Sequence, residues 1–380
     1  MLSKTNCSPG PRFKVPVIIA LFLTVPLYGA QGELPPKLLG ATSCSSSSCH
    51  GGGGADQNQY LVWSLRDFHS QRPVATLATA RSKQIADTLE IKDPTTESRC
   101  TTCHAPLQSV PQSLRGENFN ASEGVSCESC HGPAESWLRS HTRPDYTHAA
   151  RVAAGMRDLQ NLYVRANTCV ACHQNVDSDI LAAGHPELIF ELDGQSVSEP
   201  KHWREATNWN GAQAWLVGQA VALREMSWQL SREKSPSQNQ INRWTGLFRV
   251  LTTATAADRG WPVMPSGGYV PVQNWSDAFA RTIAAIEWTP TLTKKCLAQL
   301  AASDSNTVDV PTLKEVRTCE ADRLVLGLDR LVGALPELKE NQPVQATLNQ
   351  LFTDAQVRPD FNPAKFAGDL DRFSRALNGK

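Results

Sequence analysis

The 380-residue sequence lacks the arrangements that mark several common kinds of enzyme site. It contains no phosphate-binding glycine loop, no Ser/His/Asp arrangement and no paired-carboxylate arrangement. Lys and Arg together number 37, and Asp and Glu also number 37, so the formal charge is zero and no basic surface for nucleic acid is indicated. The sequence therefore predicts no catalytic residue of these classes and no nucleic-acid partner.

The apolar run near the N-terminus is short for a membrane helix. Residues 15–28 fall below the about 20 apolar residues that a spanning helix needs, and they include Pro16 and Pro26. A basic segment precedes this run and small residues follow it, which is the pattern of an export signal. We expect residues 1–32 to be a signal peptide, with an uncleaved N-terminal anchor as the alternative.

The chain is organised around a repeated cysteine motif. C-x-x-C-H occurs three times, and a stretched copy with four residues between the cysteines precedes these three. C-x-x-C-H is the attachment signature of c-type haem, in which two thiols form thioethers to the porphyrin edge and the adjacent imidazole ligates the iron. The sequence therefore predicts four covalently bound haem c groups. The attachment sites are Cys44, Cys49 and His50 (first site), Cys100, Cys103 and His104 (second site), Cys127, Cys130 and His131 (third site), and Cys169, Cys172 and His173 (fourth site).

Three other interpretations of the cysteines explain the pattern less well. A zinc site needs four ligands around one ion and gives no reason to repeat the full pentapeptide. A thioredoxin-like C-x-x-C normally appears once beside a βαβ pattern, which is absent here. A disulfide framework would not place a histidine after every second cysteine.

The remaining histidines are candidates for the second axial position of each iron. Nine histidines are present and none follows residue 202, whereas methionine occurs only four times in the whole chain. Ligation by two histidines is therefore a better general scheme than His/Met ligation, and it favours lower reduction potentials. An iron that finds no second histidine would be open to a small ligand. The candidates are His69, His141, His148, His185 and His202.

Several strings around these motifs resemble the cytochrome c-554/c-prime-like family of multihaem cytochromes. They include Trp63 to His69, Gly124 to Pro133, Ala182 to Pro186 and Pro200 to Trp203, and the resemblance extends over about residues 40 to 230. It implies His69, His141 and His185 as distal ligands, with His202 and His148 competing for the fourth place. Relatives often carry another histidine just before the Ala-Gly-His-Pro string, where this chain has Asp177-Ser178-Asp179, and some have a further haem site in the C-terminal part, which this chain lacks. In this family, haem attachment takes place outside the bacterial inner membrane, which agrees with export to the periplasm.

The second half of the chain is predicted to be helical. Apolar residues recur at helical spacing around residues 216–230, 324–335 and 366–377, and eight of the ten tryptophans lie from Trp203 onward, where core packing explains them better than a docking surface. We therefore expect a mainly α protein with a haem-organised region at 33–205, which has little regular sheet, and a helical C-terminal region at 206–380.

Two cysteines beyond the predicted signal peptide lie outside the haem sites. Cys296 and Cys319 each fall on the apolar face of a predicted helix, and the segment between these helices is polar and ends in Pro311. Antiparallel packing of the two faces would bring the sulfurs together, so the sequence predicts a Cys296–Cys319 disulfide, with two separate buried thiols as the alternative.

These patterns favour a periplasmic tetrahaem c-type cytochrome that relays single electrons between redox partner proteins, with a membrane-associated partner left open as one option. The alternative is a haem enzyme that converts a small nitrogen or sulfur compound at one five-coordinate iron. A third hypothesis gives the helical C-terminal region a docking role in a larger respiratory complex. The spin state of the irons distinguishes the carrier from the enzyme, because four irons with two histidine ligands each leave no substrate site.

Overall fold

Helices supply nearly all the regular structure, as the sequence predicted. The computed structural model describes residues 35–70, 72–302, 314–357 and 360–379, so the predicted signal peptide lies outside the described residues. Within these ranges the β structure is limited to one isolated parallel bridge between Leu38 and Arg115. The mainly α class is therefore confirmed. None of the described helices has the length and apolar content needed to cross a membrane.

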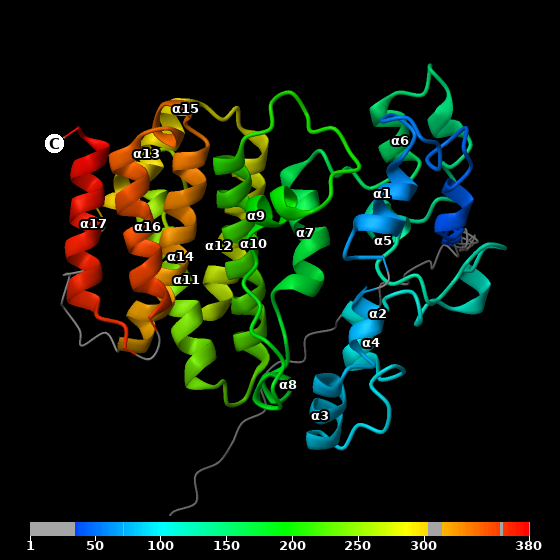
Figure 1. Ribbon diagram of the computed structural model, residues 1–380, viewed down its shortest axis with the longest axis horizontal. Helices are drawn as coiled ribbons and strands as arrows, with labels where there is room; N and C mark the ends of the chain where they lie inside the picture. Colours follow the sequence, from blue (N-terminus) through cyan, green and yellow to red (C-terminus); the bar gives the residue numbers. More distant parts are fainter. Residues whose placement is uncertain (1–34, 71, 303–313, 358–359, 380) are drawn as a thin grey trace, which may run out of the picture. The chain divides into compact units, whose positions relative to one another are not determined.

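The N-terminal half consists of short helices joined by long loops (Figure 1). Their ends carry local caps: the Asn161 side chain accepts hydrogen bonds from the backbone N–H groups of Tyr163 and Val164 at the start of α7. The helices in this half are η1 (Ala41–Cys44), α1 (Gln59–Arg66), α2 (Arg72–Thr76), α3 (Ala80–Thr88), α4 (Ser98–His104), η2 (Gln112–Leu114), α5 (Cys127–His131), η3 (Ser140–Thr142), α6 (His148–Ala153), α7 (Leu162–His173), α8 (Ser178–Ala182) and α9 (Leu192–Ser198).

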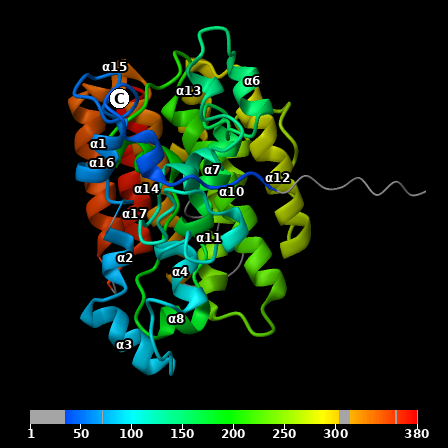
Figure 2. The same ribbon diagram turned by 90° about the vertical axis from the view of Figure 1, so that its right-hand side faces the viewer.

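The C-terminal half consists of longer helices that pack around α10. Helix α10 contacts α7, α9, α11, α12 and α14, and it lies side by side with α12 in both views (Figure 1, Figure 2). A helix with apolar residues on nearly every face is expected at such a central position. The bounds are α10 (Gly211–Arg232), α11 (Gln238–Thr255), α12 (Tyr269–Ala285), α13 (Pro290–Ala301), α14 (Lys314–Gly333), α15 (Pro336–Lys339), α16 (Gln342–Gln356) and α17 (Pro363–Leu377).

Two glycines allow close contacts between these helices. A Cβ atom on Gly218 of α10 would lie 2.8 Å from the Cβ atom of Leu192, and one on Gly327 of α14 would lie 2.5 Å from the ring of Trp215. Larger residues would separate α9 and α14 from α10, because cores are packed too densely to absorb an added methyl group at these distances.

The predicted apolar faces are buried in one continuous core. The residues predicted from spacing on α10, α14 and α17 are almost all inaccessible, as is Trp215. Trp261, Trp275 and Trp288 are partly buried and stack with one another or with Phe279, so the core interpretation of these tryptophans is confirmed. Trp228 differs, because 40% of its surface is exposed.

The predicted Cys296–Cys319 disulfide is wrong. Helices α13 and α14 contact each other as expected, but neither cysteine belongs to a disulfide in the described part of the chain. The Cβ atom of Cys319 faces α11, where it would lie 3.1 Å from a Cβ atom on Gly246, whereas Cys296 is fully buried on α13. Spacing identified the two helices but not the rotation of each helix about its axis.

A buried charged cluster ties the start of α9 to α14. Arg330 of α14 donates from Nε to both carboxylate oxygens of Glu191 at 3.1 Å, and Asp193 lies 3.8 Å from the same nitrogen. Only 6% of Glu191 is exposed. Burial raises the pKa of Glu191 to about 7, although the charge and hydrogen bonds of Arg330 oppose this shift.

We expect Glu191 to make stability depend on pH. The folded chain keeps a proton on this carboxyl up to a pKa of about 7, whereas an unfolded glutamate loses it near pH 4. The stabilisation is therefore complete below the unfolded pKa and is lost as the pH rises through the folded value. By this linkage, the free energy of unfolding of the wild type should fall by about 3 kcal/mol between pH 4 and pH 8, relative to that of the Glu191→Gln variant. Urea unfolding at the two pH values measures the difference. The control is Glu337→Gln, which changes an exposed partner of Lys294 and should keep the pH dependence of wild-type stability. Equal dependence of stability on pH in the wild type and in Glu191→Gln would contradict the expectation.

Candidate functional site

Three of the four cysteine motifs occupy the last turn of a helix. The second site ends α4, the third site spans α5 and the fourth site ends α7. Residues three apart on a helix lie on the same side, so both thiols of each motif project together and the histidine follows directly. The first site differs: Cys44 ends η1, whereas Cys49 and His50 lie in the turns that follow.

Three of the motif histidines each face one of the remaining histidines. The imidazole centroids of His50 and His141 are 6.1 Å apart. Those of His173 and His69 are 5.9 Å apart, and those of the second-site histidine and His185 are 6.3 Å apart. The structure thus brings together residues that are far apart in the sequence, and it does so for each of the three distal ligands that the resemblance implies.

These separations fit two histidines on opposite sides of one metal ion. A metal–imidazole bond is about 2 Å long, so two ligating nitrogens lie about 4 Å apart across the metal and the ring centroids about 6 Å apart. A hydrogen bond between two imidazoles would bring the centroids closer. The spacing of the three pairs therefore suits an iron between the rings.

The protein engages the Nδ1 atom of the paired histidines and leaves Nε2 for a metal. Nδ1 lies 2.9 Å from Oε1 of Gln59 in the first-site histidine, and 2.9 Å from the carbonyl oxygen of Pro73 in the second-site histidine. The carbonyl oxygens of Leu138 and Pro186 bond Nδ1 of His141 and His185 in the same way. Because a carbonyl oxygen can only accept, each Nδ1 carries the proton and each Nε2 has a free lone pair.

Nδ1 of the fourth-site histidine also faces an oxygen atom when the side-chain amide of Gln195 is turned by a half-turn. Nδ1 of His173 lies 3.1 Å from Nε2 of Gln195, while Oε1 of this glutamine is buried without a hydrogen bond. The two amide ends are exchanged by a half-turn of the side chain. That turn lets the oxygen accept from Nδ1–H of His173 and removes the unsatisfied atom.

The surroundings of the third-site histidine disfavour its charged form. Burial first, then the nearby charge of His202 and then that of His50, lower the pKa of His131 to about 4. His148, the other candidate for the fourth distal place, lies at the start of α6 with 52% of its side chain exposed, and its Nε2 atom is 3.2 Å from Asp158. The surroundings thus favour His202 over His148 as the residue opposite His131.

Cysteines of different sites also touch one another. Hydrogen bonding between the Cys44 and Cys127 thiols lowers the pKa of the first and raises that of the second. A matching contact joins Cys103 and Cys172, which lowers the pKa of Cys103 and raises that of Cys172. The first site therefore adjoins the third, and the second adjoins the fourth.

The third and fourth sites are neighbours as well. Burial raises the pKa of Cys130 to about 12, and the largest charge that adds to this shift is that of Cys169. In space the sites therefore follow one another in the order first, third, fourth, second, which is not their order in the sequence.

Residues of the second and fourth sites line one large cavity. Its volume is about 790 Å³, within the range of cofactor pockets. The cysteines and histidines of both sites line it, together with His69, His185 and apolar side chains such as Leu77 and Ile85. The paired imidazoles, the free Nε2 atoms and this cavity together fit haem as the bound group.

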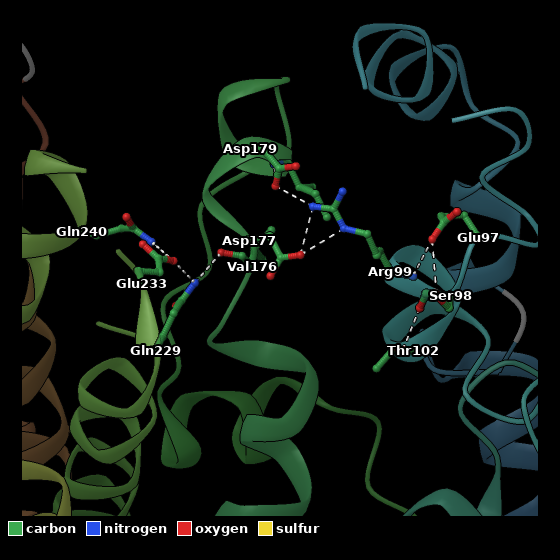
Figure 3. A network of polar contacts seen from close by, with 11 residues as sticks. Glu97, Ser98, Arg99, Thr102, Val176, Asp177, Asp179, Gln229, Glu233 and Gln240 are labelled. Carbon is green, nitrogen blue, oxygen red and sulfur yellow. Dashed lines mark hydrogen bonds and ion pairs between the residues drawn. The ribbon is translucent and has the colours of Figure 1, made fainter. Parts of the chain in front are cut away.

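An ion-pair network holds the second site against the segment that leads to His185 (Figure 3). Arg99, which precedes the first cysteine of the second site, donates to Asp177 at 3.0 and 3.1 Å and to Asp179 at 2.5 Å. On the other side of this segment, Gln229 of α10 donates to the carbonyl oxygen of Val176 at 3.1 Å. The two aspartates thus hold Arg99 and the second site beside this segment.

Sequence reasoning did not single out Glu128, the second residue of the third-site motif. Its carboxylate is buried and accepts three backbone N–H groups, from Leu39 at 2.9 Å, Gly40 at 2.7 Å and Ala134 at 2.7 Å. These bonds attach the chain just before the first site to α5. A charged residue inside an attachment motif was the available signal, but two of its three partners, Leu39 and Gly40, are 89 and 88 residues away in the sequence.

Comparison with known proteins supports the cofactor that the geometry fits. Neither a search of curated proteins nor a search of solved structures found a match to the chain. Residues 43–132, which include the first three sites and His69, match the family model described as cytochrome c554 and c-prime. The region up to the third site is thus similar to c-type cytochromes, which supports a haem c protein that takes part in electron transfer.

Proposed function

We propose that this chain is an exported, periplasmic tetrahaem cytochrome c that relays single electrons between redox partner proteins, one of them associated with the membrane. The observation that carries the proposal is the set of three histidine pairs, with ring centroids 5.9 to 6.3 Å apart, each joining an attachment motif to a distant histidine. Haem c, when bound, supplies one-electron chemistry as its iron alternates between the ferric and ferrous states.

The proposal gives each residue a defined role. The eight motif cysteines would hold the groups covalently, and each motif histidine would ligate one iron. His141 serves the first site, His185 the second and His69 the fourth, in agreement with the ring pairs. We assign His202 to the third site, because its charge lowers the pKa of His131 more than any other neighbouring charge does. We leave His148, which bonds Asp158, outside the ligand set.

The chain's residues also favour transfer between sites over chemistry at one site. Thiol contacts join the first site to the third and the second to the fourth, so neighbouring attachment points lie within reach of one another. The carrier function therefore needs no further residue, whereas an enzyme would need an iron with one histidine ligand and a group beside it to act on a substrate.

Four covalent haems per chain are the first testable consequence. A pyridine haemochrome assay on the purified protein should give four haems, and acid–acetone extraction should leave the colour with the protein, because thioethers resist it. A double variant with Cys44→Ala and Cys49→Ala should give three, whereas Cys296→Ala, changed in the C-terminal core, should still give four. Three haems in the wild type, with Cys44 and Cys49 found unmodified by mass spectrometry, would remove the first site from the proposal.

A further inference from the structure

One histidine of the site differs from the others in what holds its Nδ1 atom. The Nδ1–H groups of the other paired histidines face neutral oxygens of carbonyl groups or amides. Nδ1 of His69 instead lies 3.0 Å from Oδ1 of Asp67 and 3.7 Å from Oε1 of Glu199. The Asp67 carboxylate accepts a hydrogen bond from Nδ1–H, and Glu199 places a second negative charge beside the ring. Two carboxylates thus share one imidazole.

The two carboxylates are fixed in place by the fold. Asp67 follows α1, is 4% exposed and also accepts the backbone N–H of His69 at 2.9 Å. Glu199 is the residue directly after α9, the helix whose start is tied to α14 through Glu191 and Arg330. The same helix supplies Gln195 to His173, so α9 contacts both histidines of the fourth-site pair.

We propose that Asp67 and Glu199 are positioning residues that give the fourth site the lowest reduction potential of the chain. A carboxylate that accepts from Nδ1–H pushes electron density onto the ring and makes Nε2 a stronger donor to a metal. A stronger donor and a fixed negative charge nearby stabilise the ferric state more than the ferrous state. Neutral acceptors at the other pairs exert this effect more weakly. The inference rests on the proposed haem ligation and adds an order of potentials to it.

The effect should extend to the third site in weaker form. Ligand atoms of Asp67, Glu199 and His202 all lie within 4.8 Å of one another, so the two charges also act near His202. The Nδ1 atom of His202 is buried without a hydrogen-bond partner, so the influence of the two carboxylates on this ring is electrostatic. The potential of the third site should therefore respond in the same direction as that of the fourth, but less.

Redox titration of the full-length holoprotein, followed by optical absorption, tests this inference. Asp67→Asn and Glu199→Gln keep the shape of each side chain and remove its charge. The double variant should raise the midpoint potential of one haem by about 59 mV or more, a tenfold change in its ratio of ferric to ferrous form. A second haem should rise by less, and the other two should stay unchanged. The haem that moves most should be the one whose low-spin resonance is lost in His69→Ala.

A control is available at His148, which bonds a carboxylate, that of Asp158, through Nε2 on the surface. Asp158→Asn removes the charge beside a histidine outside the ligand set and should shift no potential. If the double variant behaves like Asp158→Asn while all four haems stay low-spin, the inference is overturned and the proposed ligation stands. If instead fewer than four haems are found, or His69→Ala leaves every iron low-spin, the failure lies in the proposed function itself.

Discussion

Replacing Glu128 with alanine is expected to lower the free energy of unfolding by about 4 kcal/mol, the largest loss of stability that we expect from a single substitution. The carboxylate satisfies the backbone N–H groups of Leu39, Gly40 and Ala134, and only 4% of the residue is exposed. Each buried donor that loses a charged acceptor costs about 1 to 3 kcal/mol, and water does not easily reach all three. Urea unfolding of the purified protein, followed by circular dichroism, measures the loss.

Glu135 provides the comparison for this substitution. It accepts the backbone N–H of Lys37 at 2.7 Å, on the same N-terminal segment, but it is exposed. Water replaces such an acceptor, so Glu135→Ala should cost less than about 1 kcal/mol. Similar losses for the two variants would mean that the segment before the first site is not held by the buried carboxylate.

Periodicity was sufficient to predict much of the C-terminal half, because the burial of a helix face depends on local spacing. Leu216, Leu328 and Phe373, for example, were placed on apolar faces by sequence and are fully buried. The Cys296–Cys319 bridge failed for a related reason. Spacing fixes which residues share a face, but the rotation that brings two faces together depends on packing against third helices, here α11 beside Cys319.

The attachment sites were equally visible in the sequence, since two thiols and an imidazole must lie within one short turn. The pairing of histidines was not, because each pair joins separate parts of the chain. His69 is the spare histidine nearest to the first site in sequence, yet it faces His173, while His50 faces His141. The Glu199 carboxylate was hidden for the same reason, since it reaches His69 through the tertiary fold alone, whereas Asp67 lies two residues before His69.

Loss of the His69 imidazole should convert one iron of four from low to high spin. In the proposed ligation, His69→Ala removes the ligand opposite His173 and leaves the thioethers of Cys169 and Cys172 intact. The haem count should therefore stay at four while one iron keeps a single histidine ligand, and a single strong axial ligand favours the high-spin ferric state. Electron paramagnetic resonance of the oxidised protein measures this as one new high-spin signal and the loss of about a quarter of the low-spin intensity.

His148→Ala is the matched control, because this imidazole is bonded to Asp158 through Nε2, the atom that the paired histidines leave free. Its removal should change neither the spin states nor the haem count. The two variants together separate a ligand from a surface histidine: a high-spin signal from His148→Ala and none from His69→Ala would reverse the assignment. A high-spin iron already present in the wild type would mean that the third site lacks His202 as its second ligand. That iron would be open to nitric oxide or cyanide, and the protein would then be a haem enzyme rather than a carrier.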